Sequence, residues 1–175
     1  MRKILALAVP VALVASPALA QTSAVNGTVT IDGSVSGRCM FTVPNKTISL
    51  GEISLTSNGK LDVSKVNGRS ETLTGWCNNT TASMTVTATE LTNATAAPTG
   101  FDNRVNYTAT AVTGSTSATD TSVTAGAGAP STVGLFTGDI VVTLSGAASP
   151  NNALMVAGTY NGNVVVTLTP TVIGG

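Results

Sequence analysis

Apolar and polar residues alternate along much of the chain, with a period of two residues. In residues 82–91, Met84, Val86 and Ala88 fall on one face and threonines fall on the other. Residues 104–112 alternate in the same way. Successive side chains of a β-strand point to opposite faces of a sheet, so one face can be buried while the other stays in water. The pattern therefore predicts half-buried strands in these segments.

The same pattern predicts further strands along the chain. They are expected within residues 24–39, within residues 40–55 as two short pieces separated by Pro44, and within residues 71–77, 138–145 and 158–170. Asn58 and Gly59 stand between alternating flanks, which is a strong signal for a hairpin turn. Pro170 should end the last strand or keep it at a sheet edge, because proline has no N–H to donate to a ladder.

Residues 113–132 form a tract of small residues without an apolar period, and we expect a surface loop or a weak edge hairpin there. No segment repeats another at a fixed period, which argues against a solenoid. Many short strands in a chain rich in threonine and valine predict an all-β sandwich.

The first twenty residues, MRKILALAVPVALVASPALA, have the three parts of a secretory signal peptide: a basic start, an apolar run and a small-residue ending. Residues 1–20 are therefore predicted to be cleaved before Gln21, and the protein to be exported. No later stretch approaches the roughly 20 apolar residues of a membrane helix. Removing 20 of the 175 residues leaves 155, which fits one domain.

Charge and residue types argue against several classes of function. Arg2 and Lys3 leave with the signal, so six of the 8 basic residues face all 8 acidic ones, and the mature net charge is about −2. This balance attracts neither nucleic acid nor an acidic membrane. The chain has no histidine, the commonest general base, and its carboxylates stand in no recognisable motif. We therefore expect no enzyme and no cofactor.

Two further features receive structural interpretations. Asn-x-Thr triplets are discounted as glycosylation sites, because a chain rich in both residues produces them by chance; they begin at Asn26, Asn45, Asn78, Asn79, Asn93 and Asn106. Trp76 is the one large aromatic that could stack on a sugar. It lies beside a cysteine, and we interpret it as a core residue.

The chain has two cysteines, Cys39 and Cys77, and an even number in an exported protein predicts a disulfide. The bond would close a loop of 38 residues (77 − 39), worth roughly 4 kcal/mol in the chain-entropy model. Two buried thiols fit an oxidising compartment less well. Two thiolates without histidine do not complete a zinc site, and no metal is expected.

The stretch VNGTVTIDGSVSGRC, residues 25–39, followed by a second cysteine in LTGWC, resembles the N-terminal half of chaperone-usher pilins, the subunits of type 1-like and related bacterial fimbriae. Gly33, Val35 and Cys39 fit the family pattern G-x-V-x-x-x-C. The stretch GTYNGNVVVTLTP, residues 158–170, is similar to the family's closing strand, although this chain continues past Pro170. Spore-coat-U-like secreted proteins share much of the pattern.

The resemblance implies an immunoglobulin-like β-sandwich, residues 32–175, that lacks its final strand and has an apolar groove between its sheets. In the family, a periplasmic chaperone fills the groove first. The N-terminal extension of the next subunit then replaces the chaperone at an outer-membrane usher. Here the extension would be residues 21–31. Its inward-facing residues would be Val25, Gly27, Val29 and Ile31, and its outward-facing ones Asn26, Thr28, Thr30 and Asp32.

The resemblance thus implies a structural subunit of a surface fimbria, with identical or related subunits as partners and a role in adhesion or biofilm formation. A second interpretation stays open, in which residues 24–39 are the first strand of a complete domain. The protein would then be a self-contained secreted sandwich that binds carbohydrate or another surface.

Overall fold

The computed structural model describes residues 24–171, so the predicted signal peptide and residues 21–23 of the predicted extension lie outside the described residues. The chain divides into two units, residues 1–34 and residues 35–175. In the first, residues 24–34 form no helix or strand and are exposed to solvent. The exposed fractions of Val25, Val29 and Ile31 are 95%, 86% and 90%. These residues therefore present apolar side chains to water.

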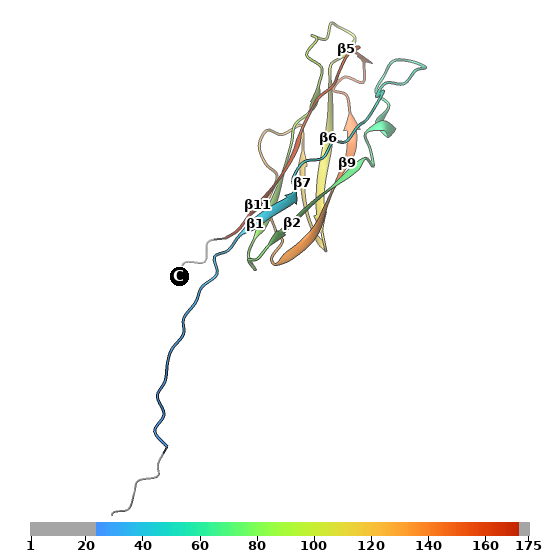
Figure 1. Cartoon of the computed structure of the whole chain (residues 1–175). Helices are drawn as coiled ribbons and strands as arrows, with labels where there is room; N and C mark the ends of the chain where they lie inside the picture. The colour runs from blue at the N-terminus through green and yellow to red at the C-terminus, as the bar shows by residue number, and fades with distance from the viewer. Residues whose placement is uncertain (1–23, 172–175) are drawn as a thin grey trace, which may run out of the picture. The chain divides into compact units, whose positions relative to one another are not determined.

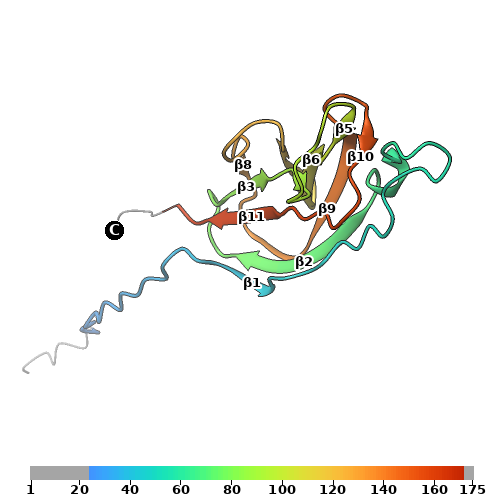
Figure 2. The same cartoon turned by 90° about the horizontal axis from the view of Figure 1, so that it is seen from above.

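The second unit contains one large antiparallel sheet (Figures 1 and 2). Five of its strands follow one another in the order β1 (Cys39–Val43), β2 (Ser70–Cys77), β9 (Phe136–Ala148), β6 (Arg104–Thr113) and β4 (Leu91–Thr92). The sixth, β7 (Thr116–Thr121), also pairs with β6. The strand β1 lies at one end of this order and pairs with β2 alone.

A second antiparallel sheet has the order β11 (Val164–Thr169), β3 (Ser83–Ala88) and β8 (Ser131–Thr132). Figure 2 shows β11 beside β3, with β1 and β2 in the other sheet. The short strands β5 (Phe101–Asp102) and β10 (Leu154–Met155) form a parallel pair. A single 3-10 turn covers Val63–Lys65. Within residues 24–171, no helix is long and apolar enough to cross a membrane.

The core lies between the two sheets and is built by strand alternation. Met84 and Val86 of β3 face Val105 and Ala109 of β6 and Ile140 of β9, and all five side chains are fully buried. The intervening residues of β3 and β6 are mostly half-buried threonines, serine and asparagine. The predicted all-β sandwich is confirmed.

Most of the predicted strands are present. The segments 71–77, 82–91, 104–112 and 138–145 correspond to β2, β3, β6 and β9. The hairpin at Asn58 is also confirmed, since Ser54 pairs with Leu61 across the turn and Gly59 adopts a φ of +67°. That backbone conformation is the reason for a glycine at this position.

The tract 113–132 is more ordered than a surface loop. Residues 116–121 pair with β6 as a hairpin, and Ala118 and Asp120 are buried. Asp120 Oδ2 accepts a hydrogen bond of 2.8 Å from the Ala88 N–H, and the Gly128 N–H donates to the Val86 carbonyl at 2.8 Å. Both bonds tie the tract to β3, so the edge-hairpin alternative describes its first half.

Cys39 and Cys77 form the predicted disulfide. They are direct partners in the register between β1 and β2, with their Cα atoms 4.1 Å apart. The bond therefore fixes the first strand of the domain to its neighbour at one end of the ladder.

Candidate functional site

The two sheets each end in a strand whose outer edge has no partner among the described residues. In the large sheet this strand is β1, and in the second sheet it is β11. The two strands come near each other in the fold (Figure 1), so the two unpaired edges lie on one side of the sandwich, which we call its open side. Unpaired N–H and C=O groups on an edge strand are a template for another strand.

The first wall of the open side continues from β1 into residues 44–52. Ile48 and Leu50 are half-buried against the core, whereas Thr47 and Ser49 between them are exposed. This is strand-like alternation, yet no hydrogen bond within the described chain involves a backbone N–H or C=O of residues 44–52. Their backbone groups are therefore left to water or to another molecule.

The second wall consists of β11 and of residues 155–163, which precede it. The side chains of Asn93 and Tyr160 fix the backbone of this wall by hydrogen bonds. The Asn93 amide donates to the carbonyls of Val156 and Ala157, at 3.3 and 3.2 Å. The Tyr160 hydroxyl donates to the Val156 carbonyl at 2.8 Å. Because these bonds lie within the single chain, the wall is preformed.

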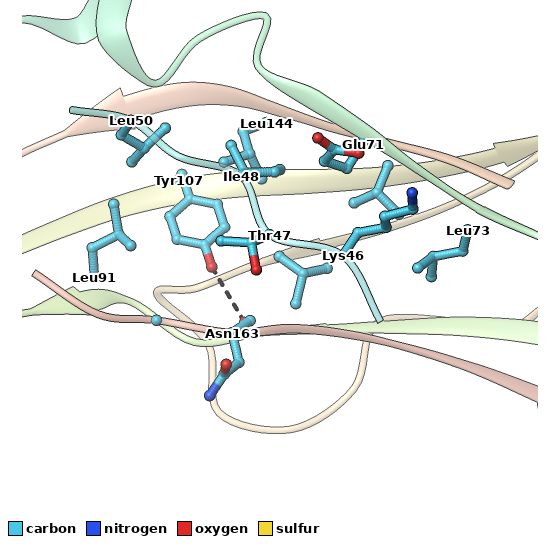
Figure 3. Close-up of a pocket in the computed structure, with 13 residues that line it drawn as sticks. Lys46, Thr47, Ile48, Leu50, Glu71, Leu73, Leu91, Tyr107, Leu144 and Asn163 are labelled. Carbon is cyan, nitrogen blue, oxygen red and sulfur yellow. Dashed lines mark hydrogen bonds between the residues drawn. The ribbon is translucent and has the colours of Figure 1, made fainter. Parts of the chain in front are cut away.

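The floor between the walls is a cavity of about 250 Å³ (Figure 3). Its apolar lining comes from both walls and from the inner face of the large sheet: Ile48, Leu50, Leu73, Leu91, Val142, Leu144 and Val164. Lys46 and Glu71 add charged groups at the same cavity. The apolar lining residues belong to the hydrophobic core or pack against it, and they remain accessible from outside the domain.

Tyr107 lies across this floor. Its hydroxyl donates to the Thr89 carbonyl at 2.7 Å and toward the Asn163 carbonyl at 3.3 Å, the second of which is drawn in Figure 3. Burial, followed by the negative charge of Asp120, raises the pKa of Tyr107 to about 12. The phenol is therefore neutral at physiological pH and serves as a hydrogen-bond donor that positions the backbone next to β11.

A second cavity of about 660 Å³ continues the first along the walls. Five residues line both cavities: Thr47, Ile48, Leu50, Leu91 and Gly162. The two cavities therefore form one elongated groove, which we call the open groove. At one end the hairpin closes it, because Lys60 pairs with Leu154 and the Met155 N–H donates to the Gly59 carbonyl at 2.8 Å.

Beyond Lys46 and Val164, which line the first cavity, β1 and β11 approach each other and no residue of β1 lines the open groove. A Cβ placed on Gly75 would be 3.4 Å from Phe41 and 3.5 Å from Leu168, so both side chains converge on this glycine. It would also be 2.8 Å from the Met40 carbonyl oxygen, which explains why a residue without a side chain stands there. The open groove therefore has an elongated shape and a free backbone edge on each side, with a mainly apolar lining in the first cavity and a mixed lining in the second. This arrangement suits an extended segment that carries apolar side chains.

The residues that the sequence assigned to the extension are placed in solvent. Val25, Val29 and Ile31 are almost fully exposed, and a Cβ on Gly27 would have no atom within 4 Å. The sequence analysis did not identify the groove residues Ile48, Leu50 and Tyr107. Alternation in ISL, residues 48–50, was a signal for an extended segment, but it could not reveal that this segment lacks a partner.

The structure also bears on the metal ligands and on the Asn-x-Thr triplets that were considered from the sequence. Among residues 24–171, no group of three or more histidine, cysteine or acidic residues could hold a metal ion. Two of the Asn-x-Thr triplets form turns: Asn79 Oδ1 accepts from the Thr81 N–H at 2.9 Å, and Asn93 Oδ1 accepts from the Thr95 N–H at 2.9 Å. Such local bonds are the usual reason for asparagine in turns.

The interpretation of Trp76 as a core residue was wrong. It is half-buried and is not part of the core, and its register partners Met40 and Thr137 are exposed. The reason is strand parity: Gly75 and Cys77 are buried, so the residue between them faces outward.

Comparison of the chain with models of known protein families, with curated proteins and with solved structures finds no match. The resemblance to chaperone-usher pilins therefore rests on the sequence motifs alone.

Proposed function

We propose that the chain is a structural subunit of a bacterial surface fimbria, polymerised by donor-strand exchange and serving adhesion or biofilm formation. The observation that carries this proposal is the open groove, which has an unpaired backbone edge on each side and a mainly apolar lining in its first cavity. A strand from another subunit would complete both ladders and cover the exposed part of the core.

The N-terminal extension has the chemistry that the open groove requires. Val25, Val29 and Ile31 recur at alternate positions and are exposed in the single chain. Burial of each would contribute about 1.5 to 3 kcal/mol. Each backbone hydrogen bond of the two new ladders would add about 1 kcal/mol. These contributions are sufficient for a stable joint between subunits.

The proposal includes the route by which the subunit reaches the surface. The predicted signal peptide directs the chain to the periplasm, where a chaperone would occupy the open groove until an outer-membrane usher catalyses exchange. The subunit would then be localised in the fimbrium at the cell surface. The disulfide is consistent with an oxidising compartment.

The test compares Gly27→Leu with the outward-facing control Thr28→Leu. A side chain at Gly27 meets no atom within 4 Å in the single subunit, so folding and disulfide formation should be unaffected. On insertion, the leucine should overpack the neighbour's groove at a cost of about 1 to 3 kcal/mol. Thr28→Leu should polymerise nearly normally, because its side chain would point to solvent.

Oligomer ladders of both variants on unboiled gels give the measurement, with chaperone-bound monomer as the folding control. Gly27→Leu should show a shortened ladder and a normal monomer. Fibres as long as those of the wild type, or loss of the folded monomer, would show that residues 24–31 are not a donor strand.

Trp76 favours a second candidate, a secreted sandwich that binds carbohydrate. It lies half-exposed on the outer face of the large sheet, two residues from Thr74, whose hydroxyl donates to Asp139 Oδ1 at 3.2 Å. An aromatic ring beside polar groups suits a sugar ring. A soluble monomer whose binding to glycans is lost in Trp76→Ala would favour this candidate over the fimbrial subunit.

A further inference from the structure

Four Asn-Gly pairs occur in the chain, and their environments differ sharply. They are Asn26–Gly27, Asn58–Gly59, Asn67–Gly68 and Asn161–Gly162. Asparagine followed by glycine is the dipeptide most prone to spontaneous deamidation, because no side chain on the second residue hinders ring closure. Whether the reaction occurs depends on how firmly the backbone and the amide are held.

Two of the pairs are held at both reacting groups. The Gly59 N–H donates to the Leu55 carbonyl at 2.7 Å, and Asn58 Oδ1 accepts from the Lys60 N–H at 3.0 Å. In the next pair, the Gly68 N–H donates to the Leu144 carbonyl at 2.8 Å. Asn67 Oδ1 accepts from the Ala147 N–H at 2.9 Å. In both pairs, hydrogen bonds hold the glycine nitrogen that would attack and the asparagine side-chain carbonyl that would be attacked. The two groups therefore cannot readily approach each other.

The pair Asn161–Gly162 is fixed by its surroundings. The Asn161 N–H donates to the Thr92 carbonyl at 3.1 Å, and its carbonyl accepts from the Thr92 N–H at 2.8 Å. A Cβ on Gly162 would lie 2.8 Å from the Glu90 carbonyl oxygen. The backbone therefore has little room to rotate into the geometry of ring closure.

Asn26–Gly27 has none of these restraints. Both residues are exposed and lie in no helix or strand, and a Cβ on Gly27 would have no atom within 4 Å. No hydrogen bond within the described chain involves the Asn26 amide or the Gly27 N–H. We propose that Asn26 is a site of spontaneous deamidation, open in the unassembled subunit and closed in the assembled one.

The reaction needs only water. The Gly27 backbone nitrogen, after loss of its proton to solvent, attacks Asn26 Cγ and forms the new C–N bond. The Cγ–Nδ2 bond then breaks, and the leaving NH2 group takes a proton from water and departs as ammonia. Water then opens the succinimide at either carbonyl. One product has aspartate at position 26, and the other has isoaspartate, in which the main chain runs through the former side chain.

The consequence for assembly rests on the proposed function. Isoaspartate lengthens the main chain by one carbon, so Val25 loses its alternation with Val29 and Ile31 and no longer enters the groove. Conversely, a strand inserted between the two free edges of the open groove would form hydrogen bonds on both sides through all its backbone N–H groups. The Gly27 N–H would then be bonded as well. Insertion would therefore protect the site, and only subunits left unassembled would age.

The test incubates the purified exported protein at mildly alkaline pH and follows the four Asn-Gly peptides by mass spectrometry. Asn26 should convert several-fold faster than Asn58, Asn67 or Asn161, which serve as internal controls. Gly27→Ala should slow conversion at Asn26 several-fold without affecting the other three pairs. Equal rates at Asn26 and Asn58 would overturn the assignment of the site.

A second arm compares unassembled and polymerised protein. Several-fold slower conversion of Asn26 in polymers is the expected result. Polymers that form but convert Asn26 as fast as monomers would overturn the protection while leaving the proposed function intact. If no polymers form at all, the proposed function fails, and the first arm still decides whether Asn26 is the site.

Discussion

Asp102 fixes the turn at residues 151–153, which precedes one wall of the open groove. Its replacement should lower the free energy of unfolding of the domain. The carboxylate is only 3% exposed. Its Oδ2 accepts hydrogen bonds from the Asn151 N–H at 3.1 Å and the Ala153 N–H at 3.0 Å, and its Oδ1 accepts from Asn151 Nδ2 at 2.7 Å. These bonds fix the turn that leads into β10 and the wall.

The size of the effect follows from the donors left behind. In Asp102→Ala, the two backbone donors lose their acceptor, and each unsatisfied donor costs about 1 to 3 kcal/mol. We therefore expect the free energy of unfolding to fall by about 2 to 6 kcal/mol. In Asp102→Asn, the amide oxygen can take the place of Oδ2, and the loss should be about 1 kcal/mol.

The pH dependence has a definite sign. Burial by itself would raise the pKa of Asp102, but hydrogen bonds from Ala153 and Asn151 outweigh it and lower the pKa below its usual value of 3.8. A carboxyl whose pKa is lower in the folded state stabilises the fold fully above its unfolded pKa. That contribution is lost as the pH falls through the folded pKa.

Urea denaturation of wild type and Asp102→Asn, from neutral pH down to below the usual aspartate pKa, gives the measurement. The difference in free energy of unfolding should be largest near neutrality and should shrink in acid, since the amide introduced by the substitution does not titrate. The exposed Asp139→Asn is the control and should stay within about 0.5 kcal/mol of wild type. A difference independent of pH would refute the role given to the Asp102 charge.

Three further outcomes are expected. Replacing both Cys39 and Cys77 by serine should lower the free energy of unfolding by up to roughly 4 kcal/mol, measured by urea denaturation; an unchanged midpoint would contradict the covalent restraint. A synthetic peptide of residues 24–31 should raise the melting temperature of the subunit, with about 2.7 kcal/mol of stabilisation at 100 times its Kd; the same peptide with leucine in place of Gly27 should have a smaller effect, and equal effects would argue against a specific fit. Tyr107→Phe should cost about 1 to 3 kcal/mol, because the Thr89 carbonyl loses its phenol partner; a loss below about 0.5 kcal/mol, on the order of a surface substitution, would show that water replaces the phenol.

The sequence predicted the strands whose alternation involves large apolar residues, such as Met84 and Val86 in β3. It allowed the strand β7 only as a weak edge hairpin, the alternative to a loop, because the buried residues there are Ala118 and Asp120, which carry little hydrophobic signal. Asp120 is buried because its partner is the Ala88 N–H, 32 residues away in the sequence. Such a partner cannot be inferred from local pattern.

The last strand shows the same limit. Alternation predicted a strand over residues 158–170, but β11 covers only Val164–Thr169. The Asn163 carbonyl still bonds next to β3, accepting from the Thr89 N–H at 2.9 Å, but Asn161 leaves that strand and pairs with Thr92. The open groove could not be predicted for the same reason, since it arises where two edges remain unpaired.

The disulfide at the start of β1 determines how the domain responds to a mechanical load. A pull on the N-terminal segment first meets hydrogen bonds, since Asn78 donates to the carbonyls of Ser36 and Arg38 at 3.1 and 3.0 Å. At Cys39 the covalent bond then passes the force directly to Cys77 at the end of β2. Strand β2 is hydrogen-bonded over its whole length to β9, from Ser70 opposite Thr143 to Cys77 opposite Phe136. Tension that passes the hydrogen bonds is therefore borne by the interior of the large sheet, and the N-terminal end of β1 cannot be pulled away from β2 without breaking a covalent bond.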